Sequence, residues 1–277
     1  MKIYRFSRFV ALPFIIILAF FVFNILNDVE YQYFAWALFP ITFLVLIYLF
    51  QPQIDYWWLD RNPIEIEPKV LTMLKDTNPR YMSFSEKDTR EFNKRMVLYL
   101  QGKAFTAKGM EQDFEVPYDV RNMLAQIPVT MTMNKKDFLL KEFDRIIVYK
   151  HAFPSPRFKF LHTVETHSED GLIIFALDHA EAAFFNPDQY YNVAWHAFAE
   201  AYTKNFPNES YPDIKEDDWK KVETTLGYPK ESILKTLGFE SIDLMPILIT
   251  CYFLKTKEFK SAAPIISKSF DNIFPTN

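Results

Sequence analysis

The chain has 277 residues, of which 49% are hydrophobic and 18% aromatic, and only 5 are glycine. This composition is typical of packed globular structure or membrane segments and argues against long disorder. The formal net charge is −4, so no basic excess points to nucleic acid as a partner. The single cysteine, Cys251, excludes an internal disulfide framework and a zinc site built from several cysteines. Its apolar neighbours favour a buried thiol.

Two apolar runs open the chain. They are Phe9–Leu26 and Tyr33–Phe50, each without a charge and close to the length of about 20 residues that a helix needs to cross a bilayer. Because a span in lipid must satisfy its own backbone hydrogen bonds, both runs are expected to be helices. The short link Asn27–Gln32 then makes residues 1–50 a transmembrane helical hairpin, which contacts the lipid bilayer through residues 9–26 and 33–50.

Charges beside the two runs predict their orientation. Lys2, Arg5 and Arg8 precede the first run, whereas the link contains acids and no base. Since positive residues favour the cytoplasm, both chain ends and the soluble domain are expected on the cytoplasmic side of the inner (cytoplasmic) membrane. The segment Tyr56–Trp58 is typical of an interfacial aromatic belt. Two alternatives stay open: a cleaved signal peptide, and a hairpin buried in a soluble core.

The rest of the chain predicts a linker and one domain. Residues 51–69, with three prolines among polar residues, are expected to be a linker before a domain at 70–277. Helices are expected at Val70–Thr77, Glu86–Gly102, Pro117–Met133, Pro187–Lys204, Trp219–Thr225, Glu231–Leu237 and Ser241–Lys257. Strands are expected at Arg145–Tyr149, Phe158–Thr166 and Gly171–Leu177. Helices, a small group of strands and further helices predict an α+β fold.

The expected helix Pro187–Lys204 carries the residues that bear on chemistry. His196 and Glu200 are four residues apart, so they lie on one face, one turn apart. A zinc peptidase uses H-E-x-x-H at this spacing. The two imidazoles bind the metal, and the glutamate takes a proton from the metal-bound water. In this chain residues 196–200 are H-A-F-A-E.

In the order of its segments, the chain resembles the Mlc titration factor A (MtfA) family of zinc-dependent peptidases over about residues 70–270. The segments that carry the resemblance are Phe92 with Lys103 and Phe105; Val120, Leu124 and Ala125; Ile146, Val148 and Tyr149 with Phe153; Gly171–Leu177; and Val193–Glu200. The resemblance implies that residues 70–277 form a mainly helical, zincin-like metallopeptidase domain with a small sheet.

The family motif is H-E-F-A-H. The resemblance therefore implies that His196 keeps the first metal ligand, Ala197 replaces the general base and Glu200 replaces the second histidine. A third ligand, a glutamate on a later helix in the family, falls on Thr250 or Cys251. A methyl group cannot accept a proton, and loss of a general base costs about 10²–10⁴ in rate. We therefore expect no catalytic residue and no cofactor, with His196 and Glu200 as at most a vestigial zinc site. A hydrogen-bonded polar pair on a half-buried helix face is the other interpretation of these two residues.

The remaining histidines and glycines indicate no substitute site. His162, His167 and His179 lie near acids in a polar segment that is expected to be a solvated loop. The nucleophile-elbow, P-loop and Rossmann glycine patterns are missing from the sequence.

Three functions stay open. The favoured one is a membrane-tethered pseudoenzyme that binds an unknown protein or peptide through the old substrate cleft, where the strand Gly171–Leu177 offers an edge. An active peptidase with a rearranged metal site would instead bind about one zinc through His196. A structural membrane protein would pack His196 and Glu200 inside, with no cleft above them.

Overall fold

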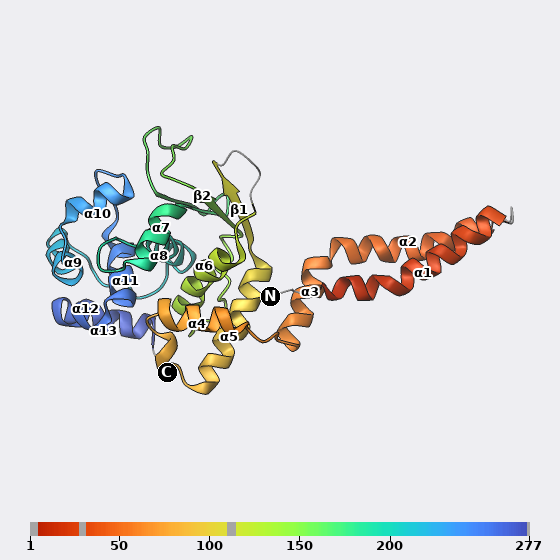
Figure 1. Ribbon diagram of the computed structural model, residues 1–277, viewed down its shortest axis with the longest axis horizontal. Helices are drawn as coiled ribbons and strands as arrows, with labels where there is room; N and C mark the ends of the chain where they lie inside the picture. Colours follow the sequence, from red (N-terminus) through yellow and green to blue (C-terminus); the bar gives the residue numbers. More distant parts are fainter. Residues whose placement is uncertain (1–4, 28–31, 110–114, 276–277) are drawn as a thin grey trace. The chain divides into compact units, whose positions relative to one another are not determined.

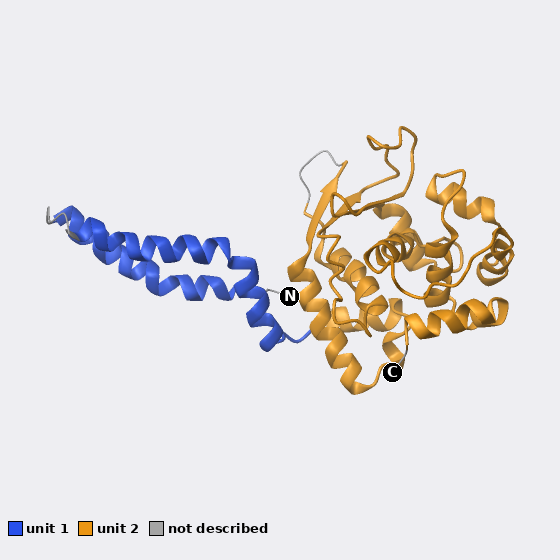
Figure 2. Cartoon of the chain, turned by 180° about the vertical axis from the view of Figure 1, so that it is seen from behind, with its two compact units in different colours: residues 1–66 blue, residues 67–277 orange. Residues whose placement is uncertain are grey.

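The computed structural model describes residues 5–27, 32–109 and 115–275. The chain divides into two compact units, residues 1–66 and residues 67–277, which Figure 2 shows in blue and orange. Among the described residues, the first unit consists of helices and the strands lie in the second (Figure 1).

The first unit contains α1 (Phe6–Asn27), α2 (Gln32–Leu49) and α3 (Gln51–Arg61). α1 and α2 lie side by side, and Phe14 stacks on Phe43 with ring centroids 4.9 Å apart (Figure 1). Among the described residues, α1 is the one helix that is long and apolar enough by itself to cross a membrane. α2 reaches that length only together with α3, from which it is bent by 67°. The second span of the expected hairpin therefore stays a prediction.

Helix α3 lies where the sequence predicts a linker. Pro52 stands in its first turn, where a missing N–H costs nothing. The buried carboxylate of Asp55 accepts hydrogen bonds from the backbone N–H (2.7 Å) and the hydroxyl (3.1 Å) of Ser7. This carboxylate satisfies the open N-terminal turn of α1, and Phe6 stacks on Trp58 beside it with ring centroids 3.9 Å apart. The first part of the expected linker is thus a folded part of the first unit.

The second unit is mainly helical with one small sheet. Its helical elements are α4 (Pro68–Thr77), η1 (Tyr81–Ser83), α5 (Glu86–Gly102), α6 (Tyr118–Met131), α7 (Leu177–Phe185), α8 (Val193–Asn205), η2 (Glu216–Asp218), α9 (Trp219–Leu226), α10 (Lys230–Leu237), α11 (Leu244–Leu254), α12 (Thr256–Ala262) and α13 (Pro264–Ile273). Its strands are β1 (Ala104–Lys108), β2 (Arg145–Tyr149), β3 (Val164–His167) and β4 (Leu172–Ala176). The strand order is β1-β2-β4-β3, with parallel pairs except for β3, which runs antiparallel to β4. The predicted α+β class is confirmed.

Local signals in the sequence account for several of these elements. α5 begins after Ser85, whose hydroxyl oxygen accepts the backbone N–H of Asp88 at 3.2 Å, as the capping pattern predicts. Pro128 is expected to end or kink the helix, but α6 continues through it to Met131. β2 has the predicted bounds, because its run of apolar β-branched residues is short and clear.

Other elements differ from the prediction. The sequence does not predict β1, because its five residues are too few to show an alternation of apolar and polar side chains. It also does not predict α7, which forms in a segment that the sequence analysis treats as polar. The helix expected from Pro187 begins only after Asn192, whose side-chain oxygen accepts two backbone N–H groups of α8. β3 begins at Val164, six residues later than expected, because the preceding segment folds into a loop.

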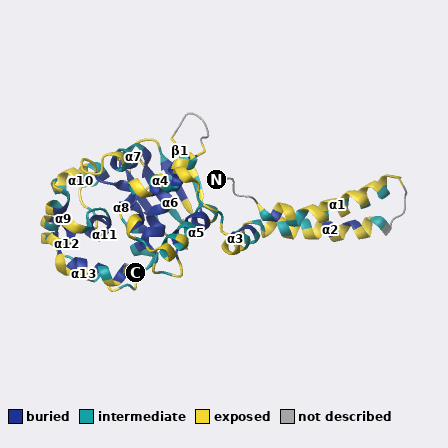
Figure 3. Ribbon diagram, turned by 60° about the horizontal axis from the view of Figure 1, so that its bottom comes forward, coloured by how far each residue is buried: buried dark blue, intermediate teal, exposed yellow. Residues whose placement is uncertain are grey.

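Helix α8 forms the buried centre of the second unit. It contacts β3 and β4 on one side, and α6, α7 and α11 on others. Its fully buried side chains include Trp195, Phe198 and Tyr202. In Figure 3 the inner elements of this unit are dark blue, whereas α1 and α2 are mostly yellow. Because protein interiors are close-packed, the groups that α8 carries are fixed in place.

Two glycines offer a matched test of how the second unit is packed. Gly227 and Gly238 end α9 and α10 with φ of +79° and +84°. A Cβ on Gly238 would lie 2.5 Å from the carbonyl oxygen of Leu161 and 2.6 Å from the Cα of His162, whereas one on Gly227 would meet nothing within 4 Å. We expect Gly227→Ala to cost about 1 kcal/mol for the backbone conformation alone. Gly238→Ala is expected to cost about 3 kcal/mol, because backbone atoms cannot give way. Urea unfolding of both variants measures the two values, and equal costs would contradict the packing of α10 on residues 161–162.

Candidate functional site

A groove of about 280 Å³ lies over helix α8. Three residues at helical spacing, His196, Glu200 and Lys204, line it from α8. The other lining residues are Val164, Glu165 and Thr166 of β3; Ser241, Ile242, Asp243 and Pro246 at the start of α11; and Arg157, Phe158 and Phe239. A strand thus forms one wall and the beginning of a helix forms another.

His196 presents an unpaired nitrogen in this groove. The residue is fully buried, and its Nδ1 is hydrogen-bonded to the hydroxyl of Tyr191 at 2.8 Å. Its Nε2 has no hydrogen-bond partner among the residues that the structure describes. Burial lowers the pKa of His196 to about 4, although the carboxylates of Glu200 and Asp243 oppose this change. His196 is therefore a neutral imidazole at pH 7.

Glu200 pairs with a lysine and not with His196. Its Oε1 lies 2.7 Å from the Nζ of Lys204, one turn further along α8. The same Nζ donates to the carbonyl oxygen (3.0 Å) and the hydroxyl (2.6 Å) of Thr166 on β3. The structure thus brings His196 and Glu200 into one groove but gives each a different partner.

Ala197 and Thr250 are buried and carry no ionisable group. The hydroxyl of Thr250 donates to the carbonyl of Pro246 in its own helix at 2.8 Å. It also contacts the hydroxyl of Tyr191, which connects α11 to His196. Thr250 is therefore linked to His196 through Tyr191, and its hydroxyl is already hydrogen-bonded within α11.

These side chains do not fit a zinc ion. A catalytic zinc site needs three protein ligands and an open position. Within the described ranges, no group of three or more His, Cys, Asp or Glu side chains is placed to hold a metal ion. His196 supplies one nitrogen, the Glu200 carboxylate is bound by Lys204, and Thr250 supplies only a hydroxyl.

The sequence predicts that the strand Gly171–Leu177 forms the edge beside the groove, but in the structure β3 forms this edge. The segment Gly171–Leu177 contains β4, which lies between β2 and β3. The N–H of Ala176 donates to the carbonyl of Thr163 at 2.9 Å. This hydrogen bond shows which residues of β3 direct their backbone N–H and C=O groups toward β4. Since alternate residues of such a strand face its partner, Val164 and Thr166 turn their N–H and C=O groups to the free edge.

A second polar cluster lies in the wall of the groove. The Oε2 and Oε1 atoms of Glu165 lie 3.1 and 2.6 Å from the Nε2 atoms of His162 and His167. Burial raises the pKa of Glu165, but hydrogen bonds from Ser155 and the two histidines hold this pKa below its ordinary value. The prediction of a solvated loop is wrong here, because His162 and Glu165 are buried. The rings that cover His162, such as Phe153, come from separate segments, so the sequence does not show them together.

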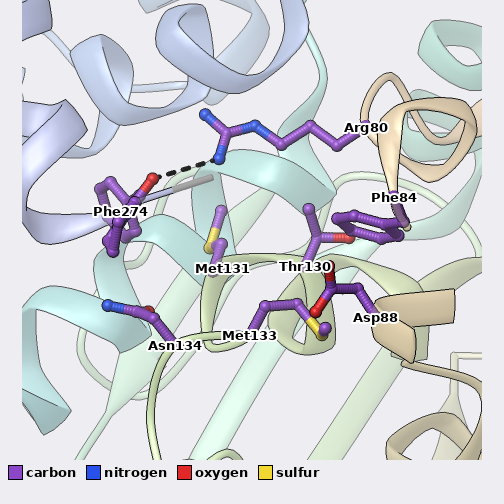
Figure 4. Close-up of a pocket in the computed structure, with 9 residues that line it drawn as sticks. Arg80, Phe84, Asp88, Thr130, Met131, Met133, Asn134 and Phe274 are labelled. Atoms are coloured by element: carbon purple, nitrogen blue, oxygen red, sulfur yellow. Dashed lines mark hydrogen bonds between the residues drawn. The ribbon is translucent and has the colours of Figure 1, made fainter. Parts of the chain in front are cut away.

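A different pocket, drawn in Figure 4, joins the C-terminal part of the second unit to η1 and α5. Arg80 donates to the carbonyl of Phe274 at 3.4 Å, and its guanidinium lies over the rings of Tyr252 and Phe253. The cavity holds about 20 Å³, which is enough for about one water molecule. It is therefore a small gap between packed segments and too small for a ligand.

A comparison with protein families identifies the chain. The sequence model of the family described as glucose-regulated metallo-peptidase M90 matches residues 55–201, more than half of the chain. The chain belongs to this family. The matched part of this M90 member includes His196 and Glu200 and ends before Thr250, and the resemblance to the MtfA-type peptidases is confirmed. No curated protein matches the chain.

The low pKa of His196 predicts a loss of stability in mild acid. As the pH falls below 6.5, the unfolded chain binds a proton at this residue while the folded chain does not, until the pH reaches about 4. Between pH 7 and pH 5 this residue is expected to cost about 2 kcal/mol of unfolding free energy. His196→Asn, which keeps a neutral partner for Tyr191, should lack this part of the loss. Urea unfolding of both proteins at the two pH values measures it, and an identical loss would contradict the neutral buried imidazole.

Proposed function

We propose that this M90-family protein is a membrane-anchored, catalytically degenerate domain that binds an extended segment of a partner protein. The observation that carries the proposal is the groove between β3 and the start of α11, which has the outermost strand of the sheet as one wall and a helix as its floor. Such an edge pairs with an extended peptide through main-chain hydrogen bonds, and the neighbouring side chains provide specificity.

Loss of hydrolysis follows from the side chains of α8. Ala197 cannot take a proton from water. The carboxylates of Glu165 and Glu200, which line the groove, are both bound by neighbouring side chains. Glu165 is held by two histidines, and Glu200 is held by Lys204. With alanine in place of the glutamate beside His196, and with no set of three metal ligands among the described residues, binding without cleavage is the function that these side chains support best.

The anchor is supported by the surface of the first unit. Large apolar side chains of α1 and α2 point outward, for example Phe23 (66% exposed), Leu26 (81%) and Tyr48 (76%). An apolar surface that surrounds two helices is unfavourable in water and favourable in a bilayer. The bases Lys2, Arg5 and Arg8 before the first apolar run support an orientation with the second unit on the cytoplasmic side of the inner membrane.

The two alternative functions have less support. A structural membrane protein needs no cleft above His196, so the groove counts against it. An active peptidase with a rearranged site needs further metal ligands, and the described side chains around His196 supply none.

Binding without turnover is the direct test. The full-length protein in detergent, with zinc added, is expected to raise the fluorescence anisotropy of dye-labelled casein without releasing dye-labelled fragments. Val164→Pro should weaken this binding about tenfold, because it removes an N–H of the free edge at the first residue of β3, where proline is tolerated. Circular dichroism checks that the variant is folded. Zinc-dependent release of fragments that a chelator abolishes would contradict the proposal.

Restoring the family's side chains tests the assignment of the lost site. Ala197→Glu, Glu200→His and Thr250→Glu together should give about one zinc per chain by elemental analysis. Ala197→Glu alone should bind none, because it adds the base without the ligands. A folded triple variant that binds no zinc would show that Thr250 is not the third position.

A further inference from the structure

The groove contains a cation of its own at the place where a bound peptide would pair with β3. The ammonium of Lys204 has three N–H donors and three acceptors within reach: one carboxylate oxygen of Glu200, and the carbonyl and hydroxyl oxygens of Thr166. Its hydrogen bonds are therefore satisfied, and it joins the floor of the groove to its strand wall.

Lys204 occupies an acceptor that an extended ligand needs. The carbonyl of Thr166 faces the free edge of β3, where the N–H of an added strand would bind. Lys204 already donates to this oxygen at 3.0 Å. A peptide that pairs with this edge must therefore displace the ammonium, whose side chain is 35% exposed and can turn to solvent.

Displacing Lys204 leaves a charge to be compensated. The groove is lined by three acids and two bases: Glu165, Glu200 and Asp243 against Arg157 and Lys204. Glu165 has its histidine partners, but Glu200, whose side chain is only 26% exposed, would lose the cation with which it is paired among the described residues. An unpaired carboxylate in this position is costly unless the ligand brings a cation.

A second feature of the same groove also points to a ligand. The Nε2 of His196 is fully buried and has no hydrogen-bond partner among the described residues, one helical turn from Glu200. Buried polar atoms are paired in nearly all folded proteins, and among the described side chains with an unpaired buried atom His196 is the one that lines this groove.

We propose that Lys204 stands in for a basic side chain of the ligand, and that the groove binds an extended peptide with a lysine or arginine facing Glu200. This inference rests on the peptide-binding function proposed above and names the class of segment that the groove selects. In the complex, a backbone N–H of the ligand donates to the carbonyl of Thr166, and the ligand cation pairs with the carboxylate of Glu200. The side chain of Lys204 turns toward solvent.

The test uses Lys204→Met in the full-length protein, which keeps the length of the side chain and removes its charge. The probes are three dye-labelled extended peptides that differ only in one central residue: lysine, norleucine or glutamate. We expect the lysine peptide to bind Lys204→Met about tenfold more tightly than it binds the wild type, because no internal cation competes. It should also bind this variant about tenfold more tightly than the norleucine peptide does.

Two further variants separate charge pairing from a general opening of the groove. Lys204→Met combined with Glu200→Gln should bind the lysine and norleucine peptides equally, because the carboxylate is gone. Lys220→Met, which removes an exposed lysine of α9, should leave every Kd unchanged. Thermal unfolding followed by circular dichroism confirms that each variant is folded.

The outcomes distinguish this inference from the proposed function. If the peptides bind the wild type but Lys204→Met binds them no more tightly, or if the glutamate peptide binds best, the inference is overturned and peptide binding stands. If no peptide binds the wild type or any variant, the proposed function fails and this inference fails with it.

Discussion

The packing of helix α8 between the sheet and α11 is the constraint on which the groove depends. Every group on the groove floor lies on this buried helix, and the two walls are the elements that it contacts. The ammonium of Lys204 links α8 to β3, because it is hydrogen-bonded to Thr166 of β3 and paired with Glu200 of α8.

Membership of a peptidase family and loss of its chemistry are compatible for a physical reason. The fold is maintained by apolar packing around α8, in which Ala197 is fully buried. Catalysis depends on a few polar groups that contribute little to that packing. Replacement of those groups therefore leaves the helix, the outermost strand and the groove in place, which is compatible with the binding function proposed above.

The wall of the groove is held by a buried carboxylate, Glu165, that is hydrogen-bonded to two histidines. Glu165 accepts from two histidines, and His162 donates from its other ring nitrogen toward the carbonyl of Phe160. Gly238 packs against the backbone of the same segment, where no side chain fits. Buried ionic groups without partners are strongly destabilising, so this network fixes the wall in one arrangement.

The sequence by itself determined the elements whose signals are local. The cap at Ser85 and the apolar run of β2 set their own boundaries, and the order H-A-F-A-E at residues 196–200 shows directly which groups an active site would lack. Only the tertiary structure decided which strand forms the free edge, because strand order depends on long-range pairing. It also decided the partner of Glu200: Lys204 is a local neighbour, but its bonds to Thr166 join residues 38 apart. Spacing along a chain predicts which side chains share a helix face, whereas contacts between distant segments appear only once the core has packed.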